Sequence, residues 1–301
     1  MIKIKPKVII FDTFFIIFRS FYSAPNLTNQ QNIEIGTVIG FFKTIMSIIK
    51  ENPQAEIFFA TESRTKTFRK EIYEEYKANR QETPQQLIHQ ISIILSTMKQ
   101  CNFNLLNVNG FEADDVIASY SNYRANLDDL VHIITIDKDL MALTDHEKIK
   151  VIDIINKKTI GSEEVFEKFK VKPNQIEDYL ALIGDASDNI PGVPGIGPKT
   201  AQDLLKKYNN INGIKNNLAH LKPKTAEMIR KNRHLLDISE ELTKLRRDVQ
   251  VSIVNNQINW QLLKETMSEH GAKSLVLLLE KNFLNKKDTT EARNSTQDEL
   301  F

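Results

Sequence analysis

Cysteine, long apolar runs and clustered histidines are all scarce in this sequence. A single cysteine, Cys101, occurs among 301 residues, so no intramolecular disulfide can form and we expect a reducing, cytoplasmic compartment. The apolar run Val8–Phe18 is interrupted by Asp12, ends at Arg19 and is too short to span a bilayer. The six histidines are scattered without the spacing of a zinc site. We therefore expect no signal peptide, no membrane association and no zinc.

Net charge of one sign is also nearly absent. The 40 lysines and arginines balance 39 acidic residues, which leaves a formal net charge of +1. A polyanion would therefore have to be bound by local basic patches. With 41% hydrophobic and 26% charged residues, the composition is ordinary for a soluble globular protein. The length suffices for one large or two modest domains.

Hydrophobic patterning predicts an α/β fold in the first half of the chain. Short apolar stretches rich in Ile, Val and Phe are typical of buried parallel strands, and helix-like segments lie between them. Alternation of strand and helix indicates a domain around a parallel sheet that ends near residue 170. The predicted strands are Val8–Phe11, Ile57–Ala60, Leu130–Ile136 and Lys148–Ile155, and the predicted helices include Gly36–Lys50 and Gln86–Lys99.

The second half of the chain has a different pattern. From Pro173 onward it predicts short helices, among them Ile176–Ile183. Pro191–Pro198 is the densest Gly/Pro cluster in the sequence and predicts a tight turn, after which Lys199–Ala201 opens a new helix. From about Asn285 the sequence is polar, and we expect a disordered tail there.

Acidic residues follow the predicted strands. Asp12 comes directly after the first strand and Glu62 just past the second, and Asp137 and Asp139 follow the third. Parallel strands share one carboxyl edge, which is where α/β proteins place their sites. Two further groups complete the set: Glu112, Asp114 and Asp115 at a predicted helix start, and Asp185 and Asp188 before the Gly/Pro turn.

This set of carboxylates predicts a metal site. Each acid alone has an ordinary explanation, as a partner of a helix dipole or as a turn former. Gathered at one sheet edge, however, so many like charges would repel each other unless cations lie among them. Oxygen ligands favour Mg²⁺ or Mn²⁺. Two such ions about 4 Å apart form the usual clamp for phosphodiester hydrolysis.

Three motifs carry a resemblance to a known family: Gly110–Ile117, Thr135–Leu140 and Gly184–Val193. They resemble, in the same order, the 5′-3′ exonuclease domain of bacterial DNA polymerase I, within the flap endonuclease family, over about residues 7 to 255. The resemblance implies a PIN-like catalytic domain with a helical arch at 1–171, a helix-three-turn-helix DNA-binding domain at 172–262, and a terminal helix with the tail at 263–301. No polymerase domain follows, so we expect a stand-alone, monomeric nuclease.

The resemblance also implies an activity and residue roles. The activity is cleavage of DNA near 5′ ends or at flaps, in primer removal, replication or repair. In the Gly/Pro turn, backbone N–H groups at Gly195, Gly197 and the helix start at Lys199 and Thr200 would hold a phosphate of the downstream duplex, beside a K⁺ ion on turn carbonyls. Metal ligands, direct or through water, would be Asp12, Glu62, Glu112, Asp114, Asp115, Asp137, Asp139, Asp185 and Asp188.

A basic segment, Phe68–Arg80, matches the arch of that family. By helical spacing, Tyr76, Lys77 and Arg80 fall on one side. Tyr76 would stack on an unpaired base, while Lys77 and Arg80 neutralise the scissile phosphate. Taken alone, the segment would be a solvated amphipathic helix. Arg19 matches a basic position of the family near the site.

Two positions depart from the family pattern. The first acid is usually followed by Gly, where this chain has Thr13, and the acid of the second strand is usually Asp, where this chain has Glu62. Glu is one methylene longer, so its carboxylate moves by about one C–C bond length. Every acidic position is nevertheless filled by an acid.

Three other functions stay open at this point. An aspartyl phosphatase or phosphotransferase would use Asp12 but needs a second Asp two residues later, where Phe14 stands. An RNA nuclease could use the same core, although the helical second half with its Gly/Pro turn favours duplex DNA. A non-catalytic or weakly active DNA-binding paralogue should have lost acids, and none is missing.

The last five residues form a separate motif. Gln297–Phe301 resembles the bacterial sliding-clamp-binding motif, in which Gln297 would bond at the edge of a pocket that Leu300 and Phe301 fill. The alternative is a frayed terminus without a partner. We expect weak, roughly micromolar binding to a clamp.

Overall fold

The computed structural model describes residues 5–23, 27–63, 65–253 and 256–284, and the chain divides into two compact units. The first unit comprises Met1–Ile16, Gln54–Thr83 and Asn104–Val254. The second comprises Ile17–Pro53, Pro84–Phe103 and Asn255–Phe301. Each unit is therefore assembled from segments that are far apart in the sequence.

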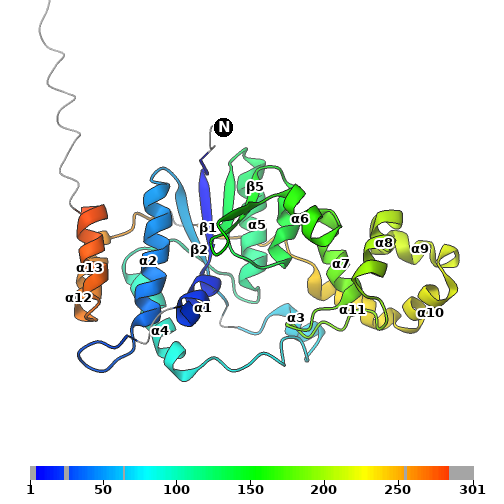
Figure 1. The fold of residues 1–301 in the computed structure, drawn as a ribbon, viewed down its shortest axis with the longest axis horizontal. Coiled ribbons are helices and arrows are strands. Elements are labelled where there is room, and N and C mark those ends of the chain that lie inside the picture. Colours follow the sequence, from blue (N-terminus) through cyan, green and yellow to red (C-terminus); the bar gives the residue numbers. More distant parts are fainter. Residues whose placement is uncertain (1–4, 24–26, 64, 254–255, 285–301) are drawn as a thin grey trace, which may run out of the picture. The chain divides into compact units, whose positions relative to one another are not determined.

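The first unit is built on a mainly parallel sheet (Figure 1). Within the described residues its strand order is β3-β2-β1-β4-β5-β6, and β6 pairs antiparallel with β5. The predicted α/β fold and its parallel sheet are confirmed, with β3 and β6 in addition. The strands are β1 Val8–Asp12, β2 Glu56–Ala60, β3 Leu105–Leu106, β4 Val131–Ile134, β5 Ile149–Asp153 and β6 Lys158–Ile160.

The central strand β1 shows why the apolar runs became strands. Val8–Phe11 is fully buried, as expected of a parallel strand covered on both faces. Burial of each such side chain contributes about 1.5–3 kcal/mol. Phe11 stacks on Phe59 of β2, with ring centroids 4.8 Å apart. The parallel register pairs Asp12 with Ala60, so β1 and β2 end at the same edge.

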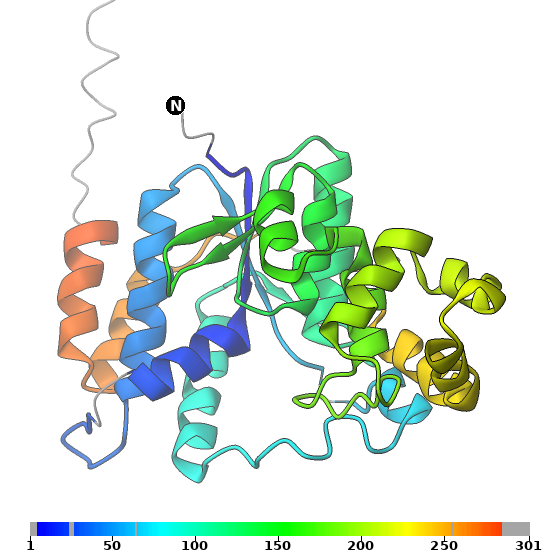
Figure 2. The same ribbon diagram turned by 45° about the vertical axis from the view of Figure 1, so that its right-hand side comes forward.

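Helix α5 (Ala113–Asn126) packs against β1, β2 and β4. The helices that follow the sheet form a group of their own in Figures 1 and 2, in which α7 packs against α8 and α11. The predicted short helices after Pro173 are thus confirmed. The remaining helices of this unit are α3 Phe68–Ile72, η1 Asp139–Asp145, α6 Ser162–Phe169, η2 Pro173–Gln175, α7 Ile176–Ile183, α8 Pro198–Tyr208, α9 Ile211–Asn216, η3 Leu218–His220, α10 Pro223–Lys231 and α11 Arg233–Thr243.

The second unit is helical. Helix α2 packs against α4 and α13, and α12 packs against α13; Trp260 stacks on Phe283 at 4.1 Å. Helix α1 (Thr13–Ser23) begins in the first unit and ends in the second. No described helix is both long and apolar enough to cross a membrane. The elements are α2 Gly36–Glu51, α4 Gln85–Gln100, α12 Trp260–Glu269, α13 Lys273–Leu279 and the π-helix η4 Glu280–Leu284. The predicted clamp-binding residues Gln297, Leu300 and Phe301 lie outside the described residues.

Candidate active site

Asp12, the last residue of β1, is held by two hydrogen bonds. The Thr135 hydroxyl donates to its Oδ2 at 2.9 Å, and the Phe15 N–H donates to its Oδ1 at 3.1 Å. Burial raises the pKa of Asp12 to about 6, and these two bonds only partly oppose the rise. The two hydrogen bonds thus fix the orientation of the carboxylate, and a nearby cation would stabilise its ionised form.

Asp137 and Asp139 follow β4 and are held by the local backbone. The Asp137 N–H donates to the Thr135 hydroxyl at 3.1 Å, and the Asp139 N–H donates to Asp137 Oδ1 at 2.9 Å. Burial and the charge of Asp137 raise the pKa of Asp139 to about 8. Its Oδ1 is buried without a hydrogen-bond partner among the described residues. A buried carboxylate oxygen of this kind suits a hard divalent cation.

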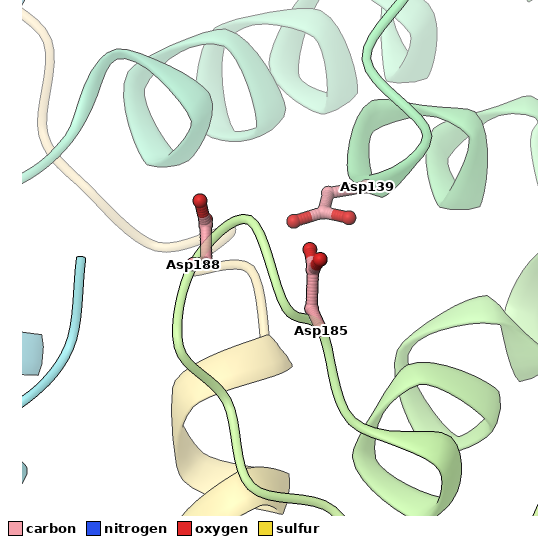
Figure 3. A group of neighbouring side chains, drawn as sticks. All are labelled: Asp139, Asp185 and Asp188. Atoms are coloured by element: carbon pink, nitrogen blue, oxygen red, sulfur yellow. The ribbon is translucent and has the colours of Figure 1, made fainter. Parts of the chain in front are cut away.

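A trio of carboxylates forms the most compact acidic group. Asp139, Asp185 and Asp188 each offer an oxygen, and these atoms lie within 4.8 Å of one another. Figure 3 shows Asp139 at the start of η1 beside Asp185 and Asp188 on the loop after α7. Burial opposes the charge of Asp185. Lys138 Nζ lies 2.6 Å from Asp185 Oδ2, however, and this contact helps to hold the pKa of Asp185 below its usual value. The trio fits a divalent ion.

The start of α5 brings more acids to this edge, as predicted. Glu112 caps the helix, and Asp114 lies in its first turn. Burial raises the pKa of Asp114 well above its usual value, and the charge of Asp137 adds to the rise. Glu62 is exposed at the surface, close to Glu112 and Ala113 at the start of α5. The crowding of protein around Glu62 raises its pKa as well. The departure to Glu at this position therefore keeps an acid at the site.

Asp115 differs from the other predicted ligands in its surroundings. It is fully buried, and both of its oxygens accept from the guanidinium of Arg69, at 2.6 and 2.8 Å. The Arg246 N–H donates to Oδ1 at 2.9 Å, and the Glu112 N–H donates to Oδ2 at 3.3 Å. These donors occupy the lone pairs that a metal would need. In this structure Asp115 is therefore the partner of Arg69, and its role as a metal ligand, direct or through water, stays a prediction.

The predicted helical arch is corrected. Helix α3 ends at Ile72, and the chain then turns, with Lys77 in the left-handed region at φ 57°. The Lys77 N–H donates to the Asp188 carbonyl at 2.9 Å. This contact with the loop after α7 replaces the hydrogen bonds of a continued helix. Residues 73–80 therefore reach the acids through turns and not through helical spacing.

Tyr76 lies inside this segment and is buried in this structure, so its predicted stacking on a base stays a prediction. Its side chain is 3% exposed and packs against Ile190 and Leu242. The Tyr76 hydroxyl donates to Glu112 Oε2 at 3.0 Å. Because burial and the Glu112 charge raise the pKa of Tyr76, the hydroxyl stays protonated. Tyr76 therefore fixes the position of Glu112.

Lys77 and Arg80 form ion pairs with the acids, and their predicted action on the scissile phosphate stays a prediction. Lys77 Nζ lies 2.9 Å from Glu112 Oε2 and 3.7 Å from Asp188 Oδ2. Arg80 Nη2 lies 2.6 Å from Asp188 Oδ1. Burial opposes the charge of Lys77, but the acids outweigh it and raise the pKa of Lys77. Both cations therefore lie beside Asp188, and Lys77 also lies beside Glu112.

The remaining predicted residues lie elsewhere. Arg19 belongs to the second unit, where its guanidinium donates to the Thr44 hydroxyl at 3.4 Å; its place beside the acids stays a prediction. Gly195 takes φ +90° in the Gly/Pro turn, and a Cβ there would meet Met228 at 2.9 Å. Gly197 caps α8. Lys199 and Thr200 open that helix, which starts one residue earlier than predicted, at Pro198. The phosphate contact of these four residues stays a prediction.

Sequence reasoning missed three residues that organise the acids: Arg69, Thr135 and Lys138. Thr135 and Lys138 stand within the Thr135–Leu140 motif, so their position beside the acids was a usable signal. Arg69 and Asp115 are 46 residues apart in the sequence, and only tertiary folding brings them together. No spacing rule predicts such a pair.

Two family models match the chain. Residues 7–170 match the N-terminal resolvase-like domain of 5′-3′ exonucleases, and residues 171–266 match their C-terminal SAM-fold domain. Together they span most of the sequence, including all the acids described above. The chain belongs to the 5′-3′ exonuclease family. The predicted family resemblance is thereby confirmed.

Curated relatives agree with membership in the 5′-3′ exonuclease family. The chain is 34% identical to a 5′-3′ exonuclease of Aquifex aeolicus over 89% of its own length and 93% of that protein. It is 36% identical to DNA polymerase I of Borreliella burgdorferi over 96% of its length, but it spans only 32% of that polymerase.

Solved structures with the same fold are more distant in sequence. The 5′-exonuclease of T5, with divalent zinc ions bound, has a TM-score of 0.65 at 21% identity and covers 91% of this chain and 97% of its own. The catalytic core of Rad2 in complex with a DNA substrate has a TM-score of 0.58 at 14% identity and covers 91% of each chain. These likenesses confirm the fold of this 5′-3′ exonuclease.

Proposed function

We propose that this 5′-3′ exonuclease hydrolyses DNA phosphodiesters near 5′ ends and at 5′ flaps with two divalent ions, Mg²⁺ or Mn²⁺. The supporting observation is the acidic trio of Asp139, Asp185 and Asp188, whose oxygens lie within 4.8 Å of one another. A second group of acids, Asp12, Glu62 and Asp114, follows β1 and β2 or opens α5, and the charge of Asp137 acts on Asp114 as well as on Asp139. Two groups of acids would suit two ions, which together form a clamp for in-line displacement at phosphorus.

When bound, the ions would supply Lewis-acid activation of a water and neutralise charge on the phosphate. The side chains of the chain hold the acids in place for this. Thr135 orients Asp12, and Tyr76 orients Glu112. Lys77 and Arg80 are placed to stabilise the negative charge that grows on the scissile phosphate. Glu112 pairs with Lys77 and would act as an outer ligand when the ions are bound.

We propose that two parts of the chain have different roles toward DNA. Residues 1–171 would carry the catalytic site, and residues 172–262 would bind the duplex. The turn at Gly195 and Gly197 would present backbone N–H groups to a phosphate, with Lys199 and Thr200 at the start of α8. A K⁺ ion on the turn carbonyls would complete this contact. DNA as the substrate class is supported by the Rad2 complex, whose fold the chain shares.

The test uses a 5′-labelled duplex with a 5′ flap, with Mg²⁺ or with EDTA. We expect release of short labelled products with Mg²⁺ only, and none from the Asp139→Asn variant. A matched substrate with an RNA flap separates DNA from RNA nucleases. Cleavage of the RNA substrate alone would replace the proposal with the RNA nuclease. No cleavage of either substrate in Mg²⁺ or Mn²⁺ would leave the inactive DNA-binding paralogue.

We also propose a sliding clamp as a second partner of a monomeric, cytoplasmic enzyme. The support is the terminal sequence Gln297–Phe301, which lies outside the described residues. Five residues bury little area, so the affinity would be roughly micromolar and would act by raising local concentration on DNA. A chain ending at Thr296 should lose clamp binding and keep flap cleavage. Equal binding by both chains would refute this part alone.

A further inference from the structure

The segment Lys244–Asp248 is fixed by a buried ion pair. Arg69 Nη2 donates to the Lys244 carbonyl at 2.9 Å, and the Arg246 N–H donates to Asp115 Oδ1 at 2.9 Å. Arg69 and Asp115 are both buried and bonded to each other. The segment cannot shift without disturbing that pair, which is strongly unfavourable. Its backbone is therefore ordered before any ligand arrives.

The outer side of this segment carries three exposed cations, Lys244, Arg246 and Arg247. They line a cavity of about 510 Å³, whose other lining residues are Phe68, Glu241, Leu245 and Asp248. Cations thus outnumber the two acids of the lining. The guanidinium of Arg246 lies 5.7 Å from the centre of the Phe68 ring, which holds it over the cavity wall.

These cations form few ion pairs with the rest of the protein, and those they form are at least partly exposed. Arg246 pairs with Asp248 at 3.1 Å, and both side chains are exposed. Arg247 Nη2 lies 2.6 Å from Glu177 Oε1 in a partly exposed pair, and its Nη1 donates to the Leu245 carbonyl at 3.1 Å. Among the residues that the structure describes, no ion pair of the Lys244 side chain occurs. An exposed ion pair contributes about 0–1 kcal/mol, so a phosphate can replace Asp248 beside Arg246 at little cost.

The cavity lies close to the acids of the active site. Arg69, next to Phe68 in the chain, bonds Asp115 and reaches within 3.5 Å of Glu112. The backbone of the cavity wall is also joined to α5 directly, because the Arg246 N–H donates to Asp115 Oδ1, and Asp115 lies in the same first turn as Asp114.

We propose that the cavity formed by Phe68, Lys244, Arg246 and Arg247 is a second phosphate-binding site, which holds the nucleic-acid strand outside the scissile position. This rests on the proposed function, because that function supplies the ligand. Planar guanidinium groups match the paired oxygens of a phosphate, and Lys244 adds a mobile positive charge. Contacts of this kind set the register of a strand without selecting its sequence.

The test is DNA binding by the full chain, measured by fluorescence anisotropy with Ca²⁺ in place of Mg²⁺ between 50 and 300 mM KCl. The variant carries Lys244→Gln and Arg246→Gln. The control carries Lys157→Gln and Lys158→Gln, which remove the same charge from an exposed hairpin outside the cavity. One probe is a duplex with a 5′ flap, and the other is the same duplex without the flap.

We expect the variant to bind the flap probe about tenfold more weakly, with the slope of log K against log[KCl] reduced by about 1–2. The control should match the wild type, and Arg246→Lys alone should give a smaller loss. A loss on the flap probe alone assigns the site to the single strand, and an equal loss on both probes assigns it to the duplex. Unchanged affinity and slope in the variant, with an unchanged melting temperature, would overturn the proposal.

These outcomes are separate from those of the cleavage test. A wild type that binds the flap in Ca²⁺ but does not cut in Mg²⁺ would refute the nuclease and leave the phosphate site standing. A wild type that cuts, with a variant that binds as well as the control, would refute the phosphate site alone.

Discussion

Asp114 and Asp115 are consecutive in the sequence but lie in opposite electrostatic surroundings. Asp115 gives both oxygens to Arg69 and is neutralised within the fold. Asp114 has no ion pair among the described residues, and burial raises its pKa together with the charges of nearby acids. The first arrangement is complete without a ligand, whereas the second gains from an added cation. An acid in a motif is therefore assigned by its neighbours and not by its place in the motif.

The same contrast divides the other acids. Asp12 and Asp139 resemble Asp114, because burial raises their pKa values to about 6 and about 8. Asp185 and Asp188 are intermediate, since Lys138 and Arg80 pair with them. Those cations are partly exposed, with side-chain exposures of 33% and 53%, so they can move aside for a metal or a phosphate. The buried Arg69 cannot.

The largest effect is expected at Asp114, the acid that has no ion pair among the described residues. Asp114→Asn should lower single-turnover cleavage of a 5′-flap duplex by about 10²–10³-fold, because it removes a ligand charge that acts in the transition state. Flap affinity in Ca²⁺ should change by less than threefold, because binding rests on basic groups. Near-normal cleavage in Mg²⁺ would show that Asp114 is not a ligand.

Asp115→Asn tests the other side. It breaks a buried ion pair and leaves Arg69 without its counter-charge, so we expect a loss of about 3 kcal/mol in the free energy of unfolding. In the fraction that stays folded, the Mg²⁺ concentration for half-maximal cleavage should remain within about threefold of wild type. Urea unfolding and a Mg²⁺ titration check the two parts. A large shift in Mg²⁺ dependence with unchanged stability would make Asp115 a ligand after all.

Lys77→Ala and Arg80→Ala test the cations between the two groups. Each should lower the cleavage step by about 10–100-fold and weaken flap binding less than fivefold, because their charge is needed most at the transition state. Single-turnover rates and anisotropy in Ca²⁺ separate the two quantities. If only the dissociation constant moves, these residues are ordinary phosphate contacts.

Prediction from sequence succeeded where a residue's surroundings are local. Continuous apolar runs such as Val8–Phe11 predict buried strands. Acids that directly follow parallel strands lie at the same edge of the sheet. The sheet and the position of most of the acids could therefore be predicted from these runs. The strands β3 and β6 escaped because one has two residues and the other is polar and exposed. The contacts of Tyr76 and Asp115 were missed for another reason. Their partners Glu112 and Arg69 are distant in the chain, and only tertiary folding brings them together.

The smallest expected effect asks whether a raised pKa alone marks a metal ligand. Burial raises the pKa of Asp178 on α7 to about 6, and Glu240 adds to the rise. Its carboxylate accepts from the Ile211 N–H at 3.2 Å and lies outside the acidic trio. Because the folded pKa exceeds the unfolded value of about 3.9, folding favours the protonated form. Ionisation of Asp178 therefore lowers the stability of the fold, and this loss is absent below about pH 4 and complete above about pH 6.

The Asp178→Asn variant keeps an acceptor for the Ile211 N–H but removes the charge. Asp178→Asn should thus raise the melting temperature by about 2 °C at pH 7.5, equivalent to about 1 kcal/mol after allowance for partial exposure, and by little near pH 4. Cleavage should be unchanged. A gain that is equal at both pH values would place its cause outside ionisation, and a loss of cleavage would extend the metal-binding acids to α7.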